Sequence, residues 1–536
     1  MNFKNFFNKL TKYKNNTYNF SILNDKLDTV PQPEENNTVV FSNIKENLDF
    51  LKSKYNVLIN SDIKIREFNM SVQNKNYKCF IIYIDGMADT ISINDFLLEP
   101  LMLGKNKYNH SYKEDLSEYI EYSLLPQNSI KKLDKFSDVF LSINSGECLL
   151  FIDTLNIAFS IDAKNFKQRS VNTPEREAVI KGPQEAYVEN LRTNTSLLRR
   201  IINNENLVIE TIPVGKISQT KCGVCYMQNI ANGDLVSEVK YRLHNLDVDS
   251  VLSSGQLEQL IEDDEGFGIP QVLSTERPDK CAKYLLQGRV VILINGNPYA
   301  LILPATIEDF LFSPEDTNLR PLFANFLRGI RVIAAIITLL LPGLYMAVTS
   351  FHQELLPTEL LFSILSAREN VPFPVIFELL LMELSFELIR EAGLRVPSVI
   401  GATVGIVGGL ILGDAAVNAG IVSPILIIII AITGIASFAI PDFSFGFHIR
   451  IFRFWFVALG AIAGFLGVGI GLFIYITMLC SVKSFGVPYT TPLSPSYNTK
   501  GNGFFIPPIW KQEYRAQFIS PKKKKAQNEI SMKWKI

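Results

Sequence analysis

Long apolar runs are confined to one part of this chain of 536 residues. Residues 325–480 contain only sixteen Asp, Glu, Lys and Arg, whereas residues 1–320 are rich in Asn, Lys, Asp and Glu. Residues 481–536 hold ten Lys or Arg against two Glu, a net charge of +8. Apolar runs of this length match a hydrocarbon layer about 30 Å thick. The sequence therefore predicts a polar region, a helical multi-span membrane domain and a basic tail.

The overall composition excludes some classes of protein. The chain is 47% hydrophobic with a net charge of -1, which argues against a nucleic-acid binder with a basic face. Six cysteines in a chain of this length do not make a disulfide framework, and the first residues lack an apolar core of signal-peptide length. We therefore expect the region before residue 320 to lie in the reducing cytosol.

Residues 1–46 are polar and Asn-rich, and they are predicted to be a disordered arm. Residues 47–320 mix short apolar runs and helical patterns, which predicts a cytosolic α/β region of two subdomains. Strands are expected at Lys78–Ile84, Leu207–Val214 and Gly223–Asn229, and helices at Pro183–Asn203 and Asp234–Asn245. Two hairpins are expected, one from Val139–Ile143 with Cys148–Asp153 and one from Gly288–Ile294 with Tyr299–Leu303. No dominant repeat is visible.

The membrane domain is expected over residues 321–482, with the tail at 483–536. Spans are predicted near residues 329–351, 398–417, 421–440 and 455–480. Glycines recur within two of them at a spacing that lets helix backbones approach closely. These candidate helix-packing residues are Gly401, Gly405, Gly409, Gly413, Gly460, Gly464, Gly467 and Gly471.

Residues 373–393 form an apolar helix that carries acidic residues. Each carboxylate at the centre of a bilayer costs about 2.5–3.5 kcal/mol, so this helix must face water, protein or the interface. At about 100° per residue, Glu383, Glu387 and Glu391 share one flank, with Arg390 beside them and Glu378 further round. They are candidate pore or polar-helix residues. The alternative is local pairing, of Glu387 with Arg390 and of Glu391 with Arg395.

The charge of the tail predicts that it stays in the cytoplasm. If the polar region is cytoplasmic too, the number of crossings is even. Four spans satisfy this when 373–393 does not cross, but they leave Arg450 and Arg453 on the outer side, against the positive-inside rule.

Catalytic motifs are not apparent in the sequence. Cys222 and Cys225 have the spacing of a redox pair or half a zinc site, but no second such pair exists and histidine is scarce. Both are expected to pack as small apolar side chains in a strand. The run Lys522–Lys525 most simply meets anionic lipid head groups. We expect no enzyme activity, no cofactor and no metal.

Several segments resemble the A subunit of the GerA family of spore germination receptors. The segment Lys181–Arg200 matches the family's signature helix, and the resemblance as a whole covers about residues 140–495. It also rests on the segments Gly268–Asp279, Gly288–Pro304, Phe310–Arg331, Leu339–His352, Glu359–Arg395 and Gly401–Val422.

The resemblance implies a nutrient-sensing receptor subunit in the spore inner membrane. Its expected partners are a transporter-like B subunit, a lipoprotein C subunit, further copies of itself and membrane lipid, without nucleic acid. In that family the B subunit is the expected primary nutrient site, and the A subunit would transmit the signal by oligomerising into an ion-conducting pathway. The alternatives are a non-conducting scaffold and a secondary transporter, although no inverted repeat is visible.

Overall fold

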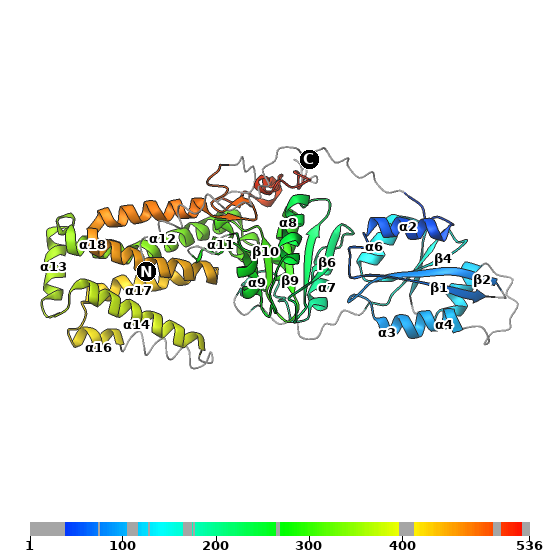
Figure 1. Ribbon diagram of the computed structural model, residues 1–536, viewed down its shortest axis with the longest axis horizontal. Helices are drawn as coiled ribbons and strands as arrows, with labels where there is room; N and C mark the ends of the chain where they lie inside the picture. The colour runs from blue at the N-terminus through cyan, green and yellow to red at the C-terminus, as the bar shows by residue number, and fades with distance from the viewer. Residues whose placement is uncertain are drawn as a thin grey trace.

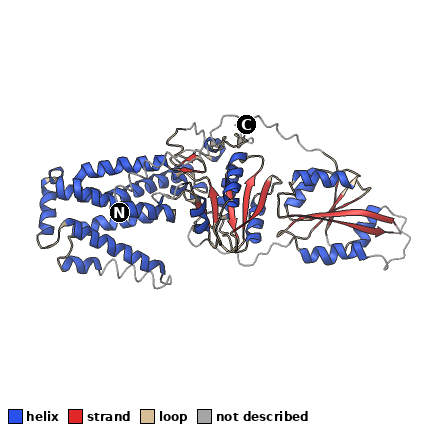
Figure 2. Cartoon of the chain, in the orientation of Figure 1, coloured by secondary structure: helices blue, strands red, loops and turns tan. Residues whose placement is uncertain are grey.

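The computed structural model describes residues 38–72, 75–103, 116–126, 129–164, 174, 177–263, 268–395, 412–496 and 505–527. The predicted arm falls largely outside these residues. The molecule is elongated, with two α/β subdomains in a row followed by a bundle of helices (Figure 1). Strands occur mainly in the two subdomains, as Figure 2 shows. The predicted α/β region is therefore confirmed, and the structure shows that its sheets are antiparallel.

The first subdomain is an antiparallel sheet of order β1-β2-β4-β5-β3, with helices on both faces. Its strands are β1 (Ile63–Val72), β2 (Lys75–Ile84), β3 (Ile130–Leu133), β4 (Cys148–Ile152) and β5 (Ala158–Ile161). The helices α2 (Ile44–Lys54) and α6 (Phe136–Asn144) cover one face. The other face carries α3 (Thr90–Ile93), η1 (Asn94–Leu98), α4 (Glu99–Leu103), α5 (Leu116–Tyr119) and η3 (Ile120–Leu124).

The predicted hairpin at Val139–Ile143 was wrong, because those residues belong to helix α6. Phe136, Val139, Phe140 and Ile143 are all buried against the sheet. Their spacing of three and four residues is that of one helix face, and it extends before the segment that the prediction considered.

The second subdomain has a sheet of order β6-β7-β9-β10-β8, which is also antiparallel. Its strands are β6 (Leu207–Val214), β7 (Thr220–Met227), β8 (Leu273–Thr275), β9 (Val290–Ile294) and β10 (Ala300–Leu303). One face carries α7 (Leu191–Ile201) and α10 (Pro278–Gln287), and the other carries α8 (Gly233–His244) and α9 (Ser254–Ile261). The predicted helix at 183–203 begins only at Leu191, because Asn190 caps it.

The two subdomains repeat each other in topology and in several matched contacts. Their elements follow the same chain order and take the same places in the sheet. Asn47 of α2 bonds the backbone N–H and C=O of Phe41, and Asn194 of α7 bonds those of Val188 in the same way. Further backbone hydrogen bonds are matched between the two subdomains. They fix the turn after β2 and the equivalent turn after β7, and the turn after β4 and the equivalent turn after β9. The α/β region is therefore an internal duplication, which the sequence analysis did not detect.

The helical region follows α11 (Ile307–Leu311) and η5 (Pro314–Thr317). It consists of α12 (Pro321–Phe351), η6 (Gln353–Leu355), α13 (Thr358–Arg368), α14 (Val375–Arg395), α16 (Leu412–Asn418), α17 (Pro424–Phe438) and α18 (Phe443–Ser481). Among the described residues, α12 and α18 are long and apolar enough to cross a membrane, and α17 is a shorter apolar helix. The predicted span 398–417 lies mostly outside the described residues.

Helix α18 reverses direction at Ala463 and Gly464, which have non-helical backbone angles. Tyr475 in the second half packs on Phe456 in the first, with ring centroids 6.1 Å apart. The structure therefore differs from the single helix predicted at 455–480. Gly464 has a φ of 60°, a value that glycine adopts readily, so it permits the turn.

The chain returns to the second subdomain after α18. The hairpin of β11 (Lys483–Ser484) and β12 (Val487–Pro488) inserts Phe485 into the core on the α8 side. The 3-10 turns η8 (Ile509–Lys511) and η9 (Gln517–Ile519) follow. Much of the predicted tail is thus folded onto the α/β region.

Candidate functional site

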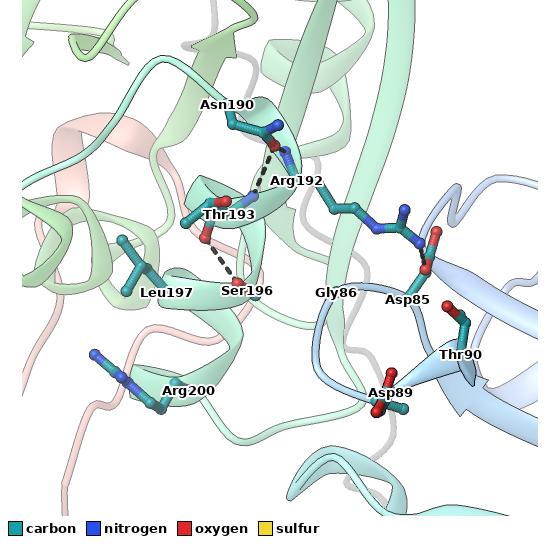
Figure 3. Close-up of a pocket in the computed structure, with 11 residues that line it drawn as sticks. Asp85, Gly86, Asp89, Thr90, Asn190, Arg192, Thr193, Ser196, Leu197 and Arg200 are labelled. Atoms are coloured by element: carbon teal, nitrogen blue, oxygen red, sulfur yellow. Dashed lines mark hydrogen bonds and ion pairs between the residues drawn. The ribbon is translucent and has the colours of Figure 1, made fainter. Parts of the chain in front are cut away.

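A cleft of about 240 Å³ lies between the two subdomains. The first subdomain contributes the loop after β2 and the start of α3, and the second contributes Asn190 and one side of α7 (Figure 3). Polar side chains dominate the lining. The lining residues are Asp85, Gly86, Ala88, Asp89, Thr90, Asn190, Arg192, Thr193, Ser196, Leu197 and Arg200.

Helix caps fix the backbone on both sides of the cleft. The carboxylate of Asp89 accepts hydrogen bonds from the backbone N–H of Ile91 at 3.1 Å and from the Ser92 hydroxyl at 2.8 Å. Across the cleft, the side-chain oxygen of Asn190 accepts from the N–H groups of Arg192 and Thr193, at 3.0 and 3.2 Å. Both sides are therefore held without help from a ligand.

The cleft presents charges of both signs. Arg192 reaches across it and forms an ion pair with Asp85, and Arg200 pairs with Glu185 (Figure 3 shows the first pair). The side chain of Arg192 is 53% exposed, so a solute can reach it. Guanidinium and carboxylate groups facing each other suit a small polar molecule that carries a carboxylate, an amine or several hydroxyls.

A second, buried ion pair joins the subdomains behind the cleft. Arg199 lies on α7 and is only 2% exposed. Its Nη2 donates to the Asp62 carboxylate at 2.8 Å and to the side-chain oxygen of Asn60 at 3.2 Å. The backbone N–H of Ser61 also donates to the carbonyl of Ile209 at 3.1 Å. The two subdomains therefore share a fixed joint on one side of the cleft.

The acidic helix α14 is paired with arginines of α18. Glu383, which is fully buried, lies 2.6 Å from Arg453. Glu387 lies 2.9 Å from Arg453, 3.2 Å from Arg450 and 3.4 Å from Arg390. Two carboxylates and three guanidinium groups thus form one network. Because α18 begins beside the second subdomain, these arginines lie in the half of the bundle nearest the α/β region.

The other predicted acidic residues lie elsewhere. Glu378 is buried, pairs with Arg368 at 3.2 Å and accepts the backbone N–H of Ser423 at 3.1 Å. Glu391 is exposed on α14. The side chain of Arg395, its predicted partner, lies outside the described residues.

The predicted packing glycines fall into three groups. Gly401, Gly405 and Gly409 lie outside the described residues, and Gly413 has room around it. Gly460 lies against Gly343 of α12, where a Cβ would come within 2.5 Å of the Gly343 carbonyl oxygen. Gly467 and Gly471 lie against Leu459, inside the α18 turn that Gly464 makes.

Cys222 and Cys225 lie on opposite faces of β7, in the two separate cores of the second subdomain. Burial raises the pKa of the Cys222 thiol to about 12. The two thiols therefore do not form a shared site, and no group of three metal-ligating side chains occurs in the described part of the chain.

One hydrophobic core connects the cleft to the helices. Leu197 lines the cleft and belongs to the same buried cluster as Phe310, Leu339 and Phe445. Phe310 and Phe445 stack with centroids 5.9 Å apart. Helix α7 therefore shares one continuous buried cluster with α11, α12 and α18.

Neither the cleft residues nor Arg450 and Arg453, the α18 partners of α14, were predicted from the sequence, whereas the predicted local pairing of Glu387 with Arg390 is present. The pairing of Asp85 with Arg192 depends on how the two subdomains meet, which no local pattern encodes. The duplication becomes visible when the matched hydrogen bonds of Asn47 and Asn194 are compared.

Comparison with known proteins places these features in context. The family model described as Bacillus/Clostridium GerA spore germination protein matches residues 49–518. Spore germination protein KA of Bacillus subtilis is 38% identical over 501 residues, 93% of this chain and 90% of that protein. Spore germination protein GerLA of Bacillus cereus is 35% identical over 85% of this chain and 89% of its own length. A crystal structure of the N-terminal domain of the A subunit of the Bacillus megaterium spore germinant receptor GerK3 is 33% identical, covering 51% of this chain and 99% of that one, with a TM-score of 0.41.

Proposed function

Because this chain belongs to the GerA family of spore germination proteins, we propose that it is the A subunit of a germinant receptor in the spore inner membrane. Its helical region would be the multi-span membrane domain, with the α/β region and the carboxy-terminal segment in the cytoplasm. B and C subunits of the same receptor are the expected partners.

The observation that carries this proposal is the continuous core from the cleft to the helices. A small polar germinant, or a change passed on by a partner subunit, would alter the ion pair of Arg192 with Asp85 and so the position of α7. The shared cluster of Leu197, Phe310 and Phe445 would pass that shift to α12 and α18. The chain would then act as the transmitting subunit.

Experiment can distinguish two roles for the subunit, an ion-conducting oligomer and a non-conducting scaffold. Glu383 and Glu387 both form ion pairs with Arg453 of the same chain. This favours a structural role, in which they hold α14 against α18, over a ring of free carboxylates that lines a pore. A conducting path would then be lined by other residues, or would form only when α14 leaves α18. A secondary transporter is less well supported, since the duplication that the described residues show lies in the α/β region.

The test compares spores that carry the full-length chain with Arg192→Gln or with Lys216→Gln. Lys216 is the matched control because it is an exposed cation of the same subdomain, paired with Asp247 and away from the cleft. We expect Arg192→Gln to raise the nutrient concentration for half-maximal germination about tenfold at unchanged chain abundance, and Lys216→Gln to leave it unchanged. Equal responses of the two variants would refute the transmitting role.

A double variant Glu383→Gln and Glu387→Gln, measured for K⁺ release in the same spores, separates the outputs. Unchanged release from folded protein excludes an acidic pore. Loss of K⁺ release from a chain that still assembles with its partners supports an acidic pore.

A further inference from the structure

The duplication assigns a counterpart to the loop that lines the cleft. In the first subdomain this loop follows β2, and in the second the corresponding loop follows β7. The backbone N–H of Asp85 donates to the backbone carbonyl of Asp62 at 2.7 Å, and the backbone N–H of Gln228 donates to the backbone carbonyl of Asn206 at 2.9 Å. Both acceptors immediately precede the first strand of their sheet.

A second pair of contacts confirms the correspondence. Gly146 follows α6 and Gly288 follows α10, both with positive φ. A Cβ on Gly146 would lie 3.3 Å from Met87, and one on Gly288 would lie 3.4 Å from Ile230. The loops 85–89 and 228–232 are therefore equivalent parts of the two subdomains.

The second loop is covered by the chain's own carboxy-terminal segment. We call residues 505–527 the strap; it lies beside the second subdomain in Figure 1. The backbone N–H of Lys522 donates to the carbonyl of Ile230 at 2.9 Å, and its Nζ donates to the carbonyl of Gln228 at 3.0 Å. The neighbouring Pro521 lies against Gly288.

The strap is a folded element. Tyr514 and Lys525 pair as antiparallel backbone, and Arg515 donates its Nε to the carbonyl of Leu286 at 2.7 Å. Phe518 and Ile519 are buried in the same core as the α8 side of the sheet. The strap thus has both a hydrophobic anchor and a set of polar contacts around the loop.

We infer that the second subdomain carries a counterpart of the cleft, and that the strap fills it. A basic residue from a later segment meets each loop, Arg192 at Asp85 and Lys522 at Gln228. The first site is left as a cavity, whereas the second is occupied by a peptide of the same chain.

This occupancy connects distant parts of the molecule. At the other end of the strap, Asn325 in the first turns of α12 exchanges two hydrogen bonds with the backbone of Ile506, at 2.8 and 3.1 Å. The side chain of Gln228 accepts from Asn56 of the first subdomain. The strap therefore ties the entry of α12 to the junction between the subdomains.

Hydrogen exchange of the intact chain in detergent tests this inference. We expect the amides of Lys522 and Arg515 to exchange far more slowly than those of an unstructured peptide. Lys522→Met should raise exchange across 514–525 about three- to tenfold, because it removes one charged hydrogen bond. Lys523→Met is the matched control. Lys523 is exposed like Lys522, but its described hydrogen bond uses the backbone carbonyl, which the substitution leaves in place, so this variant should change nothing.

Asn325→Ala gives an independent measurement at the other end. It should speed exchange at Ile506 and leave Lys522 protected, because the two ends are held separately. The inference is overturned if the strap of the unmodified chain exchanges like a free peptide, or if the Lys522 and Lys523 variants behave alike. None of these outcomes depends on a germination response.

Discussion

Glu308 is an unusual carboxylate at the junction of the second subdomain and the helices. It is 8% exposed, and its Oε1 has no hydrogen-bond partner. Burial, with a smaller contribution from Asp309, raises the pKa of Glu308 to about 7, although Arg328 and Arg289 oppose the shift. The folded protein therefore keeps a proton on Glu308 that the unfolded chain loses at lower pH.

This proton makes stability depend on pH. The stabilisation is fully present below the unfolded pKa and is lost as the pH rises through about 7. Between pH 6 and 8 this group should lower the free energy of unfolding by about 1.4 kcal/mol. Thermal unfolding of the purified chain should show this loss, and Glu308→Gln should reduce it. A pH dependence identical in the two proteins would contradict the assignment.

At the scale of single elements, glycines decide how α12 and α18 pack. Gly460→Ala would bring a Cβ within 2.5 Å of the Gly343 carbonyl oxygen, so the helices must separate. We expect a cost of about 1–3 kcal/mol, the usual range for overpacking. Gly469→Ala is the control, because nothing lies within 4 Å of its Cβ and alanine favours a helix. The midpoint of thermal unfolding in detergent distinguishes them, and equal midpoints would show that the contact is not tight.

Sequence patterns predicted elements better than their partners. The runs at Lys78–Ile84 and Leu207–Val214 are strands β2 and β6, because both have the length of a strand and are rich in β-branched or aromatic residues. The segment Val139–Ile143 was misassigned, since five residues do not distinguish a strand from a helix face. The pairing of Glu387 with Arg390 follows from a local spacing and is present at 3.4 Å. The other partners of Glu383 and Glu387 lie more than sixty residues away on α18, and no local pattern encodes which helices meet.

The duplication escaped detection for a related reason. Matched positions such as Asn47 and Asn194, or Gly146 and Gly288, are separated by slightly different distances, because loops of unequal length intervene. Only isolated residues at turns and caps are retained, whereas the strands share little beyond being apolar. Such a repeat becomes visible when hydrogen bonds, and not letters, are compared.

For the whole molecule, the packing of its ends predicts the arrangement across a membrane. The backbone N–H of Ile307, before α12, donates to the carbonyl of Tyr489, after α18, at 2.9 Å. The segments before and after the helices thus form one body and must lie on one side. The turn at Gly464 lies against Phe351 and His352, at the opposite end of the bundle.

Cysteine labelling with a membrane-impermeant maleimide tests this arrangement. Five native cysteines are buried and Cys480 is exposed, so Cys480→Ser gives a background that should not react. In that background we expect Glu354→Cys, beside the outer turn, to react in sealed right-side-out vesicles. Ile217→Cys, 79% exposed on the second subdomain, should react only after permeabilisation. Glu354 lies at the end of the bundle away from the α/β region, and Ile217 lies in the α/β region itself. Equal labelling in sealed vesicles would therefore mean that the helices do not separate two compartments, and reversed labelling would put the α/β region outside the membrane.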